Sequence, residues 1–476
     1  MIPLSGRGFN GRSNGRSAAY WWMLGGALLL HTPLAWAESI IFGEPPVTRE
    51  EPVVMPETHW VERVSVDPVR AELGFPAGTG AVSGVHTLQA QASALFPVGD
   101  NWGARLEGRL DSTWQTGDEN VERTELDYGE IYLSYRGAAR RVTLGTQKVT
   151  WGRVDELPPT DRLSVQDVTR LVLDDMEDRR RAVPALRWEE FWGDYKLDAL
   201  YVPWFRSAEL PKEGSFWHPV DRERGRIMGV PGNPAMAALI REGRFDEDAG
   251  GAGGWGLRLS RAGRGHDYAV TIQRARHSLP YYVLDTRVRE ALLTNPVDLQ
   301  AALGASPYAF ETEHPRTWVL GGDLGVAIGR STWRFEAAWL SDQPVTTEVL
   351  DYTQVEALEW VGGVEFFPGD ADLRVNLQLG GNHLLDAPET LLEDRNTYTF
   401  FGDAEQLFGR GRWEARIRFF LGLHERDVYL NPRLAYLGHE PHEWYVGYHY
   451  FEGAEGTLGG FHEHHDLFTA GLLARF

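Results

Sequence analysis

The stretch Trp102-Gly-Ala-Arg-Leu-Glu-Gly-Arg-Leu-Asp111 decides the fold class. Its even-numbered positions hold Trp, Ala, Leu, Gly and Leu, whereas the odd-numbered positions from 105 onward are charged. Because successive side chains of a β-strand point to opposite faces of a sheet, one face of this strand is apolar and the other is charged. The charged face consists of Arg105, Glu107, Arg109 and Asp111.

The same period of two returns along most of the chain, for example at 333–339, 373–379 and 413–421. A soluble sandwich would alternate in the same way, with its apolar face turned inward. Three features favour a membrane barrel instead. Aromatic residues open or close many apolar stripes, the segments are long enough to cross about 25 Å at a tilt, and the polar stripes carry both signs of charge. The charged positions in these segments include Arg334, Glu336, Arg374, Glu414, Arg416 and Arg418.

Composition excludes several other classes of protein. The 476 residues are 42% apolar, which rules out a disordered chain, and no interior stretch of about 18 apolar residues is present, which rules out a helical membrane protein. A net charge of −21 argues against nucleic acid as a partner, since phosphates need basic tracks. No cysteine is present, so disulfides and thiolate sites are excluded.

The N-terminus predicts export across the inner membrane. Residues 1–19 contain three arginines and no acid, 20–30 are apolar, and Ala35-Trp-Ala37 fits a signal-peptidase site. The alternative, a single transmembrane anchor, needs a longer apolar run. We therefore expect a signal peptide at 1–37, an acidic, proline-rich periplasmic lead-in at 38–58, and a barrel at 59–476 in the outer membrane of a Gram-negative cell.

The expected architecture is an all-β, antiparallel, up-and-down transmembrane barrel of about 18 strands. Seventeen candidate strands run from 84–97 to 465–476, one of them at 140–153, and parity requires one more within 59–76. Sixteen strands is the alternative, because the alternation shifts phase between Tyr128 and Ile131 and 182–192 is short. Tight turns and longer connections alternate, which places the long loops outside the cell.

The segment Leu144-Gly-Thr-Gln-Lys-Val-Thr-Trp-Gly-Arg153, followed by Asp161-Arg162 and Leu173-Asp-Asp-Met-Glu-Asp-Arg179, resembles a large proteobacterial family of porin-like outer-membrane proteins distantly akin to alginate-export barrels. The resemblance covers 140–205. It departs from the family at Asp161-Arg162, where relatives often have Asn-Pro, and in the order of 202–205. It implies a channel or transport role in the outer membrane without fixing a solute.

The 154–181 loop is the candidate constriction of the lumen. A loop this polar, folded inward, would narrow a pore and set its electric field. The alternative is a solvated external loop whose charges neutralise one another. The candidate constriction residues are Asp161, Arg162, Asp174, Asp175, Glu177, Asp178 and Arg179.

We expect a passive outer-membrane channel for small polar or anionic solutes. Its pore lining is predicted to include Arg105, Glu107, Arg109, Asp111, Arg334, Glu336, Arg374, Glu414, Arg416 and Arg418, either as a basic track for solutes or as ion pairs that brace neighbouring strands. The alternative is an accessory barrel of a periplasmic export or lipid-handling complex. Expected partners are outer-membrane lipid, the barrel-assembly machinery and a small polar solute; the sequence leaves the oligomeric state open.

Catalysis, a cofactor and a metal are not expected. The chain has no Gly-x-Ser-x-Gly elbow, and neighbouring His277 and Ser278 point to opposite faces of a strand. His462 and His464 would share one face of an extended strand, so a surface metal site is the alternative to a plain external loop there.

The closing strand generates a test of assembly. Positions 468, 470, 472, 474 and 476 share one face, and the chain ends on Phe476, as the last strand of Gram-negative outer-membrane barrels does. Deleting Phe476 should slow assembly, because the assembly machinery reads the terminal aromatic residue. The rate at which heat-modifiable, folded protein accumulates in the outer membrane measures this. Assembly at the normal rate would show that Phe476 is not the signal.

Overall fold

The structure is a computed structural model that describes residues 64–66, 68–78, 80–118, 120–232, 234–246, 249–369 and 372–475. The predicted signal peptide, the lead-in and Phe476 lie outside the described residues.

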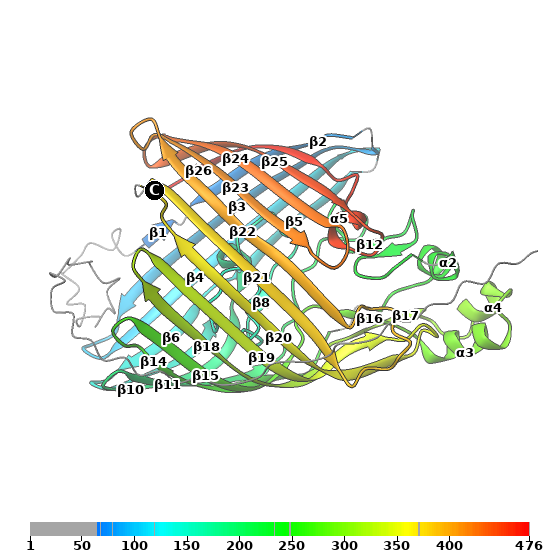
Figure 1. The fold of residues 1–476 in the computed structure, drawn as a ribbon, viewed down its shortest axis with the longest axis horizontal. Helices are drawn as coiled ribbons and strands as arrows, with labels where there is room; N and C mark the ends of the chain where they lie inside the picture. Colours follow the sequence, from blue (N-terminus) through cyan, green and yellow to red (C-terminus); the bar gives the residue numbers. More distant parts are fainter. Residues whose placement is uncertain are drawn as a thin grey trace, which may run out of the picture. The chain divides into compact units, whose positions relative to one another are not determined.

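The wall is one antiparallel sheet that closes on itself through pairing of β2 with β26 (Figure 1). Its first half comprises β1 (Val64–Val66), β2 (Val69–Pro76), β3 (Val82–Pro97), β4 (Trp102–Gly117), β5 (Val121–Tyr128), β6 (Ile131–Arg136), β7 (Arg140–Gln147), β10 (Val183–Trp192), β11 (Tyr195–Trp204) and β14 (Ala252–Arg261).

The second half of the wall comprises β15 (His266–Arg276), β18 (Arg316–Ile328), β19 (Ser331–Thr346), β20 (Tyr352–Phe366), β21 (Leu373–Leu385), β22 (Asn396–Phe408), β23 (Trp413–Gly422), β24 (Asp427–His439), β25 (His442–Gly453) and β26 (Leu467–Ala474). Both β1 and β2 pair with β3, and both β5 and β6 pair with β4, so each pair forms one interrupted wall strand. The described chain therefore forms an 18-stranded antiparallel barrel, which confirms the predicted fold class and excludes sixteen strands.

The apolar stripes face outward. Trp102, Trp333 and Trp444 lie at strand ends and are exposed on the wall, as expected for interfacial aromatic residues. Leu106 and Leu320 in the middle of strands are also exposed, whereas the alternating charged residues point inward. This outward apolar surface is typical of a barrel whose solvent is lipid.

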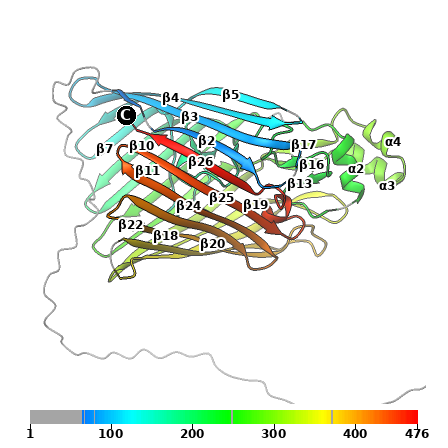
Figure 2. The same cartoon turned by 90° about the horizontal axis from the view of Figure 1, so that it is seen from above.

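The two ends of the barrel differ. One end has tight turns such as Gly193-Asp194, where Gly193 takes a positive φ of 56° that a residue with a Cβ adopts only with strain. We call this the short-turn end; Arg475 lies there. The other end, the long-loop end, carries the helices α2 to α5 (Figures 1 and 2).

The connections contain short elements of their own. They are β8 (Val165–Gln166), α1 (Met176–Arg179), β9 (Arg180–Arg181), β12 (Val220–Asp221), β13 (Arg226–Ile227), α2 (Pro234–Glu242), β16 (Tyr281–Leu284), α3 (Thr286–Thr294), α4 (Leu299–Leu303), β17 (Phe310–Glu313) and α5 (Leu458–Phe461). None of the helices among the described residues is long and apolar enough to span a bilayer.

The predicted strand 140–153 is wrong in its second half. The wall strand β7 ends at Gln147, opposite Val183, and the chain then turns into the barrel. Val149 and Trp151 keep the period of two, but they are buried in a cluster with Leu163 and Leu200 and do not face lipid. The phase shift predicted between Tyr128 and Ile131 is the interruption between β5 and β6.

Candidate functional site

Residues 148–182 form a segment inside the barrel that we call the inner loop; it contains the predicted 154–181 loop. Its two ends pack against the wall at β10 and β11. The indole Nε1 of Trp151 donates a hydrogen bond to Asp198 Oδ2 at 3.2 Å. Arg180 forms an ion pair with Asp161 and donates to the backbone oxygen of Val149 at 2.9 Å. Both loop ends therefore meet in one buried cluster.

Glu336 on β19 holds the inner loop from another part of the wall. Its carboxylate accepts hydrogen bonds from the backbone nitrogens of Arg153 and Thr160, at 2.7 and 2.8 Å, and from the Thr160 hydroxyl at 2.7 Å. The Arg153 guanidinium donates to Asp323 on β18 at 2.8 Å. Glu336 points inward, as predicted, but it is fully buried beneath the loop and does not line open space.

The acidic run around α1 reaches further strands. Asp174 pairs with Arg70 at 2.8 Å, and Asp178 pairs with the same guanidinium group at 2.6 Å. Asp175 pairs with Arg416 on β23 at 3.1 Å. Arg162 pairs with Glu359 on β20, and Arg179 pairs with Glu156 at 2.9 Å. Within the described residues Glu177 forms no ion pair and is exposed.

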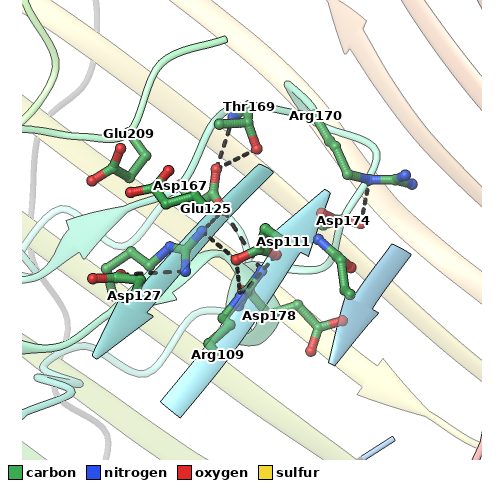
Figure 3. A network of polar contacts seen from close by, with 12 residues as sticks. Arg109, Asp111, Glu125, Asp127, Asp167, Thr169, Arg170, Asp174, Asp178 and Glu209 are labelled. Atoms are coloured by element: carbon green, nitrogen blue, oxygen red, sulfur yellow. Dashed lines mark hydrogen bonds and ion pairs between the residues drawn. The ribbon is translucent and has the colours of Figure 1, made fainter. Parts of the chain in front are cut away.

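A buried charge network ties the loop to β4 and β5 (Figure 3). The Arg181 guanidinium donates to Asp111 at 2.9 Å and to Asp127 at 3.4 Å, and it also pairs with Asp167. Asp111 in turn accepts from Arg109 at 2.8 Å. Sequence reasoning missed Asp127, because nothing in a linear sequence pairs it with Arg181 on another segment.

The predicted pore-lining arginines all have carboxylate partners. The pairs are Arg105–Glu107 at 2.6 Å, Arg109–Asp111 at 2.8 Å, Arg334–Asp155 at 3.2 Å, Arg374–Asp403 at 2.5 Å, Arg416–Asp175 at 3.1 Å and Arg418–Glu156 at 2.8 Å. Glu414 pairs with Arg433 at 3.2 Å. This geometry favours mutual bracing over a bare basic track; whether these side chains line a conducting pore stays a prediction.

Arginine side chains keep two carboxylates of the loop, Asp174 and Asp175, charged. Burial raises the pKa of Asp174, but Arg170 and Arg70 lower it more, so the pKa lies below its ordinary value. Burial likewise raises the pKa of Asp175, and Arg416 and Arg418 outweigh it. Both carboxylates are therefore anions at neutral pH and hold the loop electrostatically.

Two cavities lie on either side of α1. A polar cavity of about 440 Å³ has Glu414, Glu443 and Arg475 of the short-turn end in its lining, together with Asp175 and Asp178. An apolar cavity of about 400 Å³ lies at the long-loop end, with Arg179 in its lining. One helical turn thus contributes to both linings.

The histidines proposed as an alternative metal site lie in the connection before β26. His462 is buried, and its Nδ1 lies 2.8 Å from Nδ1 of His465, while its ring packs near Trp217. Within the described ranges, no group of three or more His, Asp or Glu residues could hold a metal ion.

Residues 79–409, more than half of the chain, match the family model described as "Protein of unknown function (DUF1302)". The chain belongs to the DUF1302 family. The match is much longer than the 140–205 segment on which the porin-like resemblance rests. No curated protein matches this DUF1302 chain in sequence. Nothing in these comparisons concerns alginate-export barrels, so that likeness stays a prediction.

Many solved structures are similar to the chain, including the following three. The outer-membrane channel DcaP of Acinetobacter baumannii has 8% identity and a TM-score of 0.41, with 87% of this chain and 97% of that chain covered. OpdL of Pseudomonas aeruginosa has 9% identity and a TM-score of 0.45, with 87% and 98% covered. OccAB2 of A. baumannii has 9% identity and a TM-score of 0.48, with 88% and 99% covered. Membership of the family rests on the sequence match alone.

Removing the core of the inner loop tests whether it closes the lumen. Deletion of residues 163–179 should raise the conductance of the reconstituted barrel, because the material between the two cavities is lost while β7 and β10 keep their pairing. Single-channel recording in planar bilayers measures this. Unchanged conductance in a variant that still shows heat-modifiable migration would reject a constriction at this loop.

Proposed function

We propose that this DUF1302 protein is an outer-membrane channel for small polar or anionic solutes, and that the inner loop controls passage. The observation that carries the proposal is the polar cavity that Asp175 and Asp178 line. Its lining mixes guanidinium groups and carboxylates from the wall and the loop, as at Arg70, Asp178 and Arg433. An 18-stranded barrel encloses more space than wall side chains fill, so its interior is an aqueous path unless other chain occupies it.

The inner loop occupies that path in a way that allows it to shift. Its ends are fixed by buried groups such as Trp151 and the Arg180–Asp161 pair. In the middle, the buried Asp174 is also held by ion pairs with Arg70 and Arg170. The Asp175 side chain in the Arg416 pair, however, is about half exposed to solvent. Exposed pairs contribute little and are weakened by salt. We therefore infer that the part of the loop around Asp175 shifts while its ends stay in place.

The accessory barrel remains the second candidate. An inner loop that reaches β2, β18, β19, β20 and β23 also suits a barrel that stays sealed and serves as a platform. Bilayer recording separates the two functions, because a sealed platform shows no conductance steps with or without residues 163–179.

A matched pair of variants tests control by the loop. Asp175→Asn removes the charge that pairs with Arg416, and the open population should rise about fivefold, since an exposed pair is worth about 1 kcal/mol. Glu177→Gln removes the same charge from the same helical turn without breaking an ion pair of the described residues. Open probability in planar bilayers and efflux of a small sugar acid from liposomes measure both.

Equal open probabilities for Asp175→Asn, Glu177→Gln and the unmodified protein would contradict control by this ion pair. Efflux that stays at the level of empty liposomes, even after deletion of 163–179, would contradict the channel and favour the accessory barrel.

A further inference from the structure

The apolar cavity at the long-loop end is built from segments far apart in the sequence. The inner loop contributes Leu171 and Val172, the connection after β11 contributes Trp217 and Met228, and β16 contributes Leu284. Further lining comes from Phe310, Leu350, Leu392 and Leu458. Six separate connections of the chain therefore converge on one space.

Its chemistry differs from that of the rest of the interior. The lumen-facing wall carries ion pairs at nearly every strand described above, whereas this lining is dominated by Leu, Val, Met, Pro and aromatic side chains. A volume of about 400 Å³ falls within the range of small-molecule sites, which are mostly apolar with a few placed polar groups. Leaving apolar surface around open space is unfavourable unless an apolar group can occupy it.

Arg179, at the end of α1, is the one cation in this lining among the described residues. The lining also contains Glu393, whose carboxylate accepts hydrogen bonds from the Tyr281 hydroxyl and the Thr346 backbone nitrogen. Arg179 is buried, with only 7% of its surface exposed, and its Nε has no hydrogen-bond partner among the described residues.

The ion-pair partner of Arg179 is Glu156, which also pairs with Arg418 at 2.8 Å. Arg418 has a second carboxylate in Asp175 at 3.6 Å, whereas the only ion pair of Arg179 among the described residues is with Glu156. The unpaired Nε of Arg179 therefore leaves part of a buried cation uncompensated at this edge of an apolar space.

A buried cation that lacks full compensation favours an anion, and a carboxylate matches the guanidinium geometry best. An apolar wall favours a hydrocarbon or aromatic body. We propose that the cavity binds an amphipathic carboxylate, with its apolar part among Met228, Leu284 and Phe310 and its anionic head directed to Arg179.

This site deepens the proposed function. Its role as an entry site for a transported solute rests on that function, whereas binding of the carboxylate does not. α1 places Arg179 at the apolar cavity and Asp178 at the polar cavity, and Glu156 links Arg179 to Arg418, which lines the polar cavity. A carboxylate bound at Arg179 competes with Glu156 and so acts directly on the contacts that hold the loop.

The test compares octanoate with octanamide, which has the same length without the charge. Each is titrated calorimetrically into the full chain in lipid nanodiscs, with empty nanodiscs as the blank. One molecule of octanoate should bind per chain, and its affinity should be at least tenfold higher than that of octanamide. In Arg179→Gln the ratio of the two affinities should fall to about one, and in Met228→Trp, which fills the cavity, both affinities should fall.

Arg287→Gln is the matched control, because Arg287 lies exposed on α3 and is absent from the cavity lining. It should keep the full ratio. Equal binding of octanoate and octanamide to the unmodified protein would overturn the anionic head, and an unchanged ratio in Arg179→Gln would overturn the role of Arg179. Heat signals equal to those of empty nanodiscs would overturn the site. Specific binding without conductance would reject the channel but leave the site intact.

Discussion

The structure depends on one constraint: backbone N–H and C=O groups that face hydrocarbon have no water to bond with. A sheet meets that constraint only by closing on itself, which here requires β2 to pair with β26 along eight residues. Closure with 18 strands fixes a wide interior. Wall side chains fill a barrel of about eight strands, so this one needs further chain or water inside. The inner loop supplies that chain.

Filling a charged interior with polypeptide creates a second requirement. Each wall charge that the loop covers loses water and needs a partner. Glu336 shows how this is met: it is fully buried, and it accepts hydrogen bonds from three backbone nitrogens and one hydroxyl of the loop. Arg181 meets the same requirement with carboxylates from two wall strands and from the loop itself. The same contacts therefore brace the wall and hold the loop in place.

The wall could be predicted from the sequence because lipid and lumen alternate along each strand, as at Trp102 to Asp111. The prediction failed where burial inside the barrel produces the same pattern: Val149 and Trp151 alternate like lipid-facing residues, yet they pack within the inner loop cluster. A period of two shows which side chains avoid water, but it does not show whether lipid or the protein interior surrounds them. Only the end of pairing at Gln147 and Val183 distinguishes the two cases.

The candidate site was predictable in its members and not in its pairings. The acids of α1 and the arginines of β23 were recognisable by type and face, but Asp175 and Arg416 are 241 residues apart. Arg70 and Asp127 were missed for the same reason. The apolar cavity left no sequence signal, because each contributing segment has the sequence of an ordinary loop, and the apolar lining arises only when six such segments meet.

The interior contains a polar and an apolar cavity, and the helical turn α1 contributes to the lining of both. Asp178 and Arg179 are adjacent in sequence but contribute to a polar and an apolar cavity respectively. Glu156 forms ion pairs with both Arg179, which lines the apolar cavity, and Arg418, which lines the polar cavity. Any change in the partner of Arg179 therefore alters the charge balance felt by Arg418, without a long chain of intermediates. A loop held in this way responds to the chemistry of one cavity through contacts that belong to the other.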